Sequence, residues 1–267
     1  MATVTTGSTP TAEDRRRQVV VTVAEVFCVV GTLVGLGVLG TQVEDSAGGA
    51  LAADATLLAP AGPAFSIWTP IYLGLLGYTV WQWLPEHATD RRHRATGWLA
   101  AASMVLNASW LLVTQQGWVW VSVVVILALA ATLFALVDRL QRTPSYGVGE
   151  SVLVDGTFGL YLGWVVVASA ANVFAALSSS GVRLDGGALA TVLALVGVGL
   201  VAAVGVGLAR RFGGRWSVAV ALAWGLAWAG WGRLADEPAS VPVGLAALVA
   251  AVVVVAAATQ EHARLTV

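Results

Sequence analysis

Residues 98–137 read WLAAASMVLNASWLLVTQQGWVWVSVVVILALAATLFALV. Apart from a short polar break at residues 115–117, this stretch is apolar almost throughout. A helix that crosses a membrane needs about 20 mostly apolar residues, with a lower limit of about 17. The stretch therefore predicts two consecutive spans, 98–114 and 118–137, joined by a tight turn.

The rest of the chain repeats this pattern. Of its 267 residues, 58% are hydrophobic and 11% are charged, whereas soluble domains have about 25% charged residues. Six further apolar runs reach spanning length, so we expect an all-α integral membrane protein with eight spans, located in the cell membrane. The six runs are 19–41, 63–84, 149–177, 188–209, 216–232 and 241–259.

The arginines predict the orientation of these spans. The chain has no lysine, so all 14 basic residues are arginines. With eight spans and a cytoplasmic N-terminus, only Arg183 and Arg233 lie outside, and the other twelve lie inside, as the positive-inside rule requires. Both termini are therefore expected in the cytoplasm. The net charge of −1 offers no basic excess for binding nucleic acid.

Composition divides the chain into three parts. Residues 1–18 are polar and are expected to form a disordered cytoplasmic tail. Five spans follow within residues 19–177, and a polar break separates them from a three-helix extension over residues 188–259. The long acidic loop between the first two spans, residues 42–62, lies on the outer side. A loop of this length is usually either functional or disordered.

Polar and aromatic residues recur in pairs inside three of the spans. In hydrocarbon a polar side chain without a partner is costly, so such residues either link helices or line a cavity. With a rise of about 1.5 Å per residue, five of the six lie in the outer half of their spans. This convergence predicts a pocket beneath the first loop, although each tryptophan alone could belong to an interfacial aromatic belt. The six residues are Trp68, Tyr72, Asn107, Trp110, Trp164 and Asn172.

Two acidic residues, Glu25 and Asp155, also lie within spans, near their cytoplasmic ends. They could form a protonated or hydrogen-bonded pair between the first and fifth spans. The alternative is that each reaches the inner membrane surface separately. The single cysteine, Cys28, allows no internal disulfide, and no histidine lies at membrane depth. We therefore expect no metal site and no axially ligated haem in the bundle.

Three segments carry a resemblance to a known family. Residues 68–72, WTPIY, are similar to its W-x-x-L-Y segment, and residues 106–110, LNASW, to its L-N-x-x-W. Residues 161–164, YLGW, followed by Asn172, are similar to P-Y-L-x-W…L-N, with Leu160 and Ala171 as departures. Order, spacing and helix number agree with the TspO/MBR family of tryptophan-rich sensory proteins and translocator proteins. The resemblance covers about residues 19–177, and the last three spans have no counterpart in it.

The resemblance implies a five-helix bundle with a ligand pocket under the first loop, in a protein that often forms homodimers. The implied ligands are tetrapyrroles such as protoporphyrin or haem, and sterols or other lipid-like molecules in some members. No cofactor is expected to be required, and membrane lipid is the other expected partner. The residues implied to line or support the pocket are Trp68, Tyr72, Asn107, Trp110, Tyr161, Trp164, Ala168 and Asn172.

The function expected from these observations is that of a membrane receptor, sensor or transporter-like protein for a flat hydrophobic ligand. Two alternatives stay open. One is a secondary transporter that uses Glu25 and Asp155, although such proteins usually contain internal repeats and none is evident. The other is a porphyrin-modifying protein, since the resemblance links Trp68 and Trp164 to light-dependent porphyrin breakdown. Conventional catalysis is not expected, because the sequence offers no nucleophile–base pair.

Overall fold

The computed structural model describes residues 9–143, 145 and 147–266. Within these residues, seven helical segments are long and apolar enough to cross a membrane. This confirms the expected all-α, multi-pass fold. The segments are α1 (Ala12–Gly35), α3 (Arg91–Gln115), α4 (Val119–Gln141), the run Val148–Ser179, α7 (Gly187–Arg211), α8 (Trp216–Ala235) and α9 (Val241–Thr266).

The remaining predicted span is built from two pieces. The helix α2 (Trp68–Trp81) has 14 residues, and the 3₁₀ helix η2 (Gly62–Ile67) leads directly into it. Pro63 lies in the first turn of η2, where its missing N–H costs no hydrogen bond. With rises of about 1.5 and 2.0 Å per residue, the two pieces together extend over about 33 Å, close to the hydrocarbon thickness.

The first helix begins earlier than predicted. Thr11 and Asp14 form a capping box, in which the Thr11 hydroxyl accepts from Asp14 N at 3.2 Å and the Asp14 carboxylate accepts from Thr11 N at 3.0 Å. Asp14 and Arg17 are buried. The prediction of a disordered tail over residues 1–18 is therefore wrong for residues 12–18, because they form the start of α1. Residues 1–8 lie outside the described residues.

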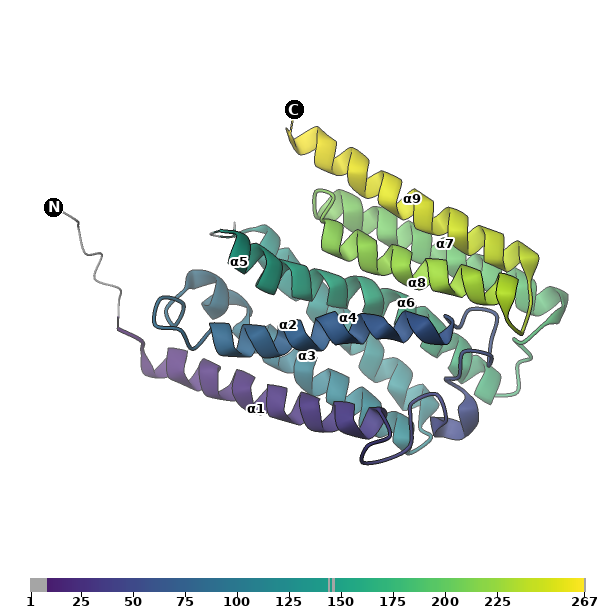
Figure 1. The fold of residues 1–267 in the computed structure, drawn as a ribbon, viewed down its shortest axis with the longest axis horizontal. Coiled ribbons are helices and arrows are strands. Elements are labelled where there is room, and N and C mark those ends of the chain that lie inside the picture. Colours follow the sequence, from purple (N-terminus) through teal and green to yellow (C-terminus); the bar gives the residue numbers. More distant parts are fainter. Residues whose placement is uncertain (1–8, 144, 146, 267) are drawn as a thin grey trace.

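The long helices lie roughly alongside one another (Figure 1). Strong contacts run in series from α1 to α3, α4, α6 (Thr157–Ser179), α8, α9 and finally α7. The helix α2 lies against α6 and α1. We call the end of the bundle where α1 begins and α9 finishes the inner end. We call the opposite end, which carries the first loop and its short 3₁₀ turn η1 (Ser46–Gly49), the outer end.

Glycines allow close approach where the helices cross. A Cβ atom on Gly31 of α1 would lie 2.8 Å from Cβ of Ala108 on α3. A Cβ atom on Gly163 of α6 would overlap the carbonyl oxygen of Val218 on α8. Small residues at such crossings allow the backbones of membrane helices to pack tightly. The last three helices are therefore packed directly onto the first five through α6.

Candidate functional site

An aromatic cluster joins α2 to α6 in the outer half of the bundle. The ring of Trp68 stacks on Tyr72, with centroids 5.1 Å apart and planes inclined by 13°. It meets Tyr161 and Trp164 edge-on, at 5.8 and 6.1 Å. Phe65 meets Trp164 edge-on at 5.6 Å. These are the preferred geometries of aromatic pairs, so two of the predicted motifs meet in one cluster.

Asn107 links this cluster to the neighbouring helices. Its Nδ2 donates to the Tyr72 hydroxyl at 3.1 Å and approaches Cys28 Sγ at 3.5 Å. The residue is 1% exposed. Asn107 therefore connects α3 with α2 and α1, and it positions the phenol ring that stacks on Trp68.

Asn172 makes a second polar link. Its Oδ1 accepts from Trp110 Nε1 at 2.7 Å, and its Nδ2 donates to Ser122 Oγ at 2.9 Å. This connects α6 with α3 and α4. Both asparagines thus brace helices through side-chain hydrogen bonds, which is the usual use of such residues in membranes. Cys28 and Ser122, which sequence reasoning did not select, complete these links.

A cavity of about 370 Å³ lies between α1, the first loop, α2 and α3 at the outer end. Small-molecule sites usually have volumes of about 300–1,000 Å³. Its aromatic wall is formed by Phe65, Trp68, Tyr72 and Trp110. The polar side chains at this cavity include Thr32, Gln42, Glu44 and Thr69. The predicted pocket beneath the first loop therefore has a counterpart in the structure.

A second cavity of about 40 Å³ lies next to the first and is lined by three more of the predicted residues, Trp164, Ala168 and Asn172. Phe65 and Trp110 line both cavities. The eight predicted residues therefore converge but do not line one space. Asn107 and Tyr161 line neither cavity. Asn107 supports Tyr72, and the Tyr161 hydroxyl bonds to Ser103 O at 3.3 Å.

The first loop is held over these cavities by α8. Arg233 is 1% exposed and donates to the carbonyl oxygens of Thr56 and Ala53. Just after the loop, in η2, Ala64 O accepts from Trp224 Nε1 at 2.9 Å. Sequence reasoning used Arg233 only as a topology signal. An arginine at the end of an apolar span, next to a stripe of tryptophans, was the only hint of this role.

The predicted pair of Glu25 and Asp155 is wrong. Asp155 Oδ1 accepts from Arg92 Nη2 and from Arg215 Nη1, both at 2.7 Å. Asp155 lies in the π-helical turn η3 (Ser151–Gly156), between α5 (Val148–Glu150) and α6. Two guanidinium groups at this depth stabilise its carboxylate better than a second carboxyl group would. Glu25 is 4% exposed, and its Oε2 has no hydrogen-bond partner among the described residues.

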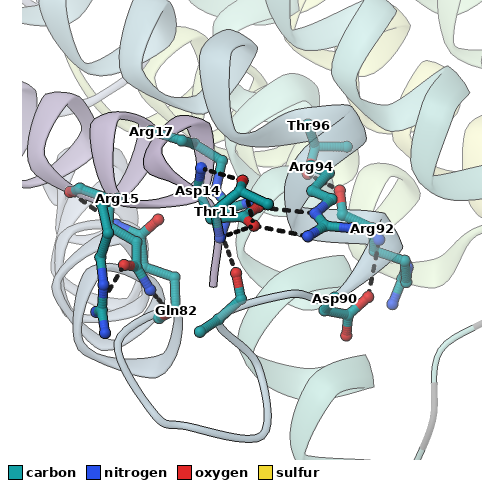
Figure 2. Close-up of polar contacts among 11 residues, drawn as sticks. Thr11, Asp14, Arg15, Arg17, Gln82, Asp90, Arg92, Arg94 and Thr96 are labelled. Atoms are coloured by element: carbon teal, nitrogen blue, oxygen red, sulfur yellow. Dashed lines mark hydrogen bonds and ion pairs between the residues drawn. The ribbon is translucent and has the colours of Figure 1, made fainter. Parts of the chain in front are cut away.

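The inner end carries a connected network of charges, part of which Figure 2 shows. The carboxylate of Asp14 accepts two hydrogen bonds from Arg94, at 2.7 and 2.6 Å, and one from Arg17 at 3.2 Å. Arg17 also donates to Ala88 O at 2.8 Å. Arg92 pairs with Glu150 at 3.0 Å as well as with Asp155. The arginines of this end therefore bind α1, α3, the α2–α3 connection and η3 together.

The chain matches the model of a known protein family. The model of the family described as TSPO-like protein matches residues 19–259. The matched range is well over half of the chain and includes the three C-terminal helices, which the motif resemblance did not reach. No curated protein and no solved structure matches the chain.

Proposed function

We propose, from the premise that this chain belongs to the TSPO-like protein family, that it binds a flat hydrophobic ligand of the tetrapyrrole class beneath its first loop. The family and the seven spanning segments make the chain a multi-pass integral membrane protein with a sensor, receptor or transporter-like role. The predicted resemblance to the TspO/MBR family is thereby confirmed. The ligand class and its position are the proposal, and the expected homodimer stays a prediction.

The observation that carries the proposal is the aromatic wall of the 370 Å³ cavity. Flat ring systems bind aromatic side chains through offset stacking and edge contacts. Trp68 already stacks on Tyr72 along this wall, and Trp110 is held in place by Asn172. The wall is therefore oriented before a ligand arrives, which lowers the entropic cost of binding.

Polar groups near the wall suit the polar edge of such a ligand. Gln42 and Thr69 offer hydrogen-bond donors and acceptors at the cavity. The indole N–H of Trp164, 1% exposed, has no hydrogen-bond partner among the described residues. Buried N–H groups are nearly always paired. A ligand acceptor that reaches the smaller cavity would pair with this group.

Titration of protoporphyrin into the purified full-length protein in detergent tests the proposal, with porphyrin absorbance as the signal. Trp68→Leu removes a stacking face and keeps an apolar side chain. An aromatic pair contributes about 0.5–1.5 kcal/mol, so we expect the dissociation constant to rise about 2- to 12-fold.

The matched control is Trp231→Leu, because Trp231 is 58% exposed on α8 and lines neither cavity. We expect this variant to bind as the wild type does. An unchanged affinity in Trp68→Leu, or an equal loss in both variants, would contradict the assigned site.

The transporter alternative that depended on a Glu25–Asp155 pair has no support from the side-chain positions. The Asp155 carboxylate already accepts hydrogen bonds from Arg92 and Arg215. Glu25 is buried on α1, three residues before Cys28, and its Oε2 has no hydrogen-bond partner among the described residues. A proton-coupled mechanism would therefore have to use Glu25 without Asp155.

A further inference from the structure

Two histidines and an aspartate meet at the inner end, far from the aromatic cavities. His87 and Asp90 lie in the connection between α2 and α3, and His93 lies in the first turn of α3. One ligand atom from each of the three lies within 4.8 Å of the other two. We propose that His87, Asp90 and His93 bind one divalent transition-metal ion, and that zinc is the ion this ligand set favours.

His93 is the strongest indication of a ligand. The residue is 0% exposed, yet neither ring nitrogen has a hydrogen-bond partner among the described residues. Its ring lies 5.4 Å from the ring of Tyr78 and 6.1 Å from that of His87. Buried polar atoms in native proteins are nearly always satisfied, so an orphaned imidazole calls for a partner. Coordination to a metal ion supplies one.

His87 is oriented towards the same point. Its ring stacks on Trp81, with centroids 4.3 Å apart and planes inclined by 18°. Its Nδ1 lies 4.0 Å from Asp90 Oδ2, and its Nε2 lies 3.9 Å from Glu86 Oε1. Both distances are too long for hydrogen bonds. They suit a histidine that binds a metal through one nitrogen and is oriented by a carboxylate through the other.

Asp90 is held with one oxygen free for this role. Its Oδ1 caps α3 by accepting from Arg92 N at 2.8 Å, a contact that Figure 2 shows. Its Oδ2 is the oxygen nearer to His87. The cap restrains the carboxylate, so less entropy is lost when the second oxygen binds a metal.

The ligand set and its spacing fit zinc. Zinc takes imidazole nitrogens and carboxylate oxygens at about 2.0–2.2 Å, in tetrahedral sites with ligand atoms about 3.4 Å apart. The atoms here start within 4.8 Å of one another, and binding draws them together. His87 lies in the turn region between α2 and α3 and is 20% exposed, so it moves most easily. The fourth position is open to water.

Nearby arginines do not exclude a cation, because acidic groups compensate for them. Asp14 pairs with Arg17 and Arg94. Glu150 and Asp155 both pair with Arg92. The metal would then join the α2–α3 connection to the start of α3, and it would close the inner end where the ion pairs of α1 and α3 already converge.

Metal retention by the full-length protein in detergent tests this proposal. The protein is stripped with a chelator, loaded with Zn²⁺, desalted and analysed for bound metal by mass spectrometry. We expect one zinc per chain in the wild type. His87→Ala and Asp90→Asn should each weaken zinc binding more than tenfold. Asparagine retains the helix cap, so Asp90→Asn tests the ligand without removing the start of α3.

His262→Ala is the matched control, since His262 is the third histidine of the chain and lies near the end of α9. We expect it to retain zinc. Substitution with Co²⁺ should give the visible absorption of a four-coordinate site in the wild type and lose it in His87→Ala. His93→Ala should lose zinc too, and the helical circular dichroism spectrum reports separately whether each variant is folded.

Three results would overturn the proposal. They are a wild type that retains no zinc after loading, His87→Ala and Asp90→Asn variants that retain as much zinc as the wild type, and an equal loss in His262→Ala. The zinc assay does not involve the aromatic cavities, so its outcome is independent of the proposed ligand function.

Discussion

The two ends of this bundle hold their helices together by different chemistry. At the outer end, neutral groups meet: stacked rings around Trp68 and amide hydrogen bonds from Asn107 and Asn172. At the inner end, arginines and carboxylates meet, with Asp155 between Arg92 and Arg215. Neutral links in membranes are weak one by one, whereas breaking a buried ion pair is costly. We therefore expect the links around Trp68, Asn107 and Asn172 to break more easily than the ion pairs of the inner end.

The largest effect is expected from Arg92→Ala. The substitution removes the guanidinium that pairs with Glu150 and Asp155, so two acidic groups lose a buried counterion. Breaking such a pair costs about 3–5 kcal/mol of unfolding free energy. Unfolding in detergent mixtures, followed by circular dichroism, measures the loss. The control is Arg142→Ala, because Arg142 is 69% exposed in its pair with Asp138, and we expect almost no change. Similar losses in both variants would contradict the special role of the inner network.

A smaller and more local effect is expected from Arg233→Ala. The change removes two charged hydrogen bonds to the first loop, and each such bond contributes about 1.5–3 kcal/mol. If the free energy of local unfolding falls by the contribution of one such bond, amide exchange in residues 53–61 becomes about 10- to 150-fold faster. Hydrogen exchange with mass spectrometry measures the rate. Arg183→Ala is the control, since Arg183 is exposed. Unchanged exchange in Arg233→Ala would show that the loop is held elsewhere.

Asn172→Leu tests the neutral links of the outer end. It keeps the side-chain size and removes the bonds to Trp110 and Ser122. Interhelical hydrogen bonds in membranes average about 0.6 kcal/mol, with a maximum of about 1.7, so we expect a loss of about 1 kcal/mol in the same unfolding experiment. Thr191→Val is the control, because the Thr191 hydroxyl bonds only to Gly187 O in its own helix. A loss as large as that of Arg92→Ala would remove the distinction between the two ends.

The smallest effect is expected from Tyr72→Phe. This substitution keeps the ring that stacks on Trp68 and deletes the hydroxyl that accepts from Asn107. We expect a loss of about 0.6 kcal/mol in stability and a change of less than about threefold in porphyrin affinity. Porphyrin titration measures the latter. A tenfold weaker affinity would mean that the hydroxyl contacts the ligand directly.

Local patterns predicted the spans well, because membrane insertion depends on the length of apolar runs. The orientation expected from the arginines stays a prediction. The true start of α1 was missed, because the polar composition of residues 12–18 was given more weight than the local capping-box pattern of Thr11 and Asp14. The partners of Asp155 were missed for a different reason. Arg92 and Arg215 come from distant segments, and the π-helical turn that presents Asp155 has no simple sequence signal.

The candidate site was predicted in part. Motif spacing brought Trp68, Tyr72 and Trp164 together, because helical periodicity determines which side chains share a face. Spacing could not show that Phe65 and Trp110 line two separate cavities, since this depends on side-chain packing under the loop. The three-residue spacing of His87, Asp90 and His93 was visible in the sequence. Spacing alone could not show that these side chains meet, because this depends on the turn between α2 and α3.

The contacts between Arg233 and the first loop can form only late in synthesis. Its partners in the first loop, Thr56 and Ala53, precede it by 177 and 180 residues. Ribosomes synthesise about 5–20 residues per second, so the loop waits on the order of 10–35 s for this arginine. During that interval the early spans are already inserted while the cover of the aromatic cavity lacks its anchor. Ligand capture at this stage of biogenesis would meet a more open site than the finished protein presents.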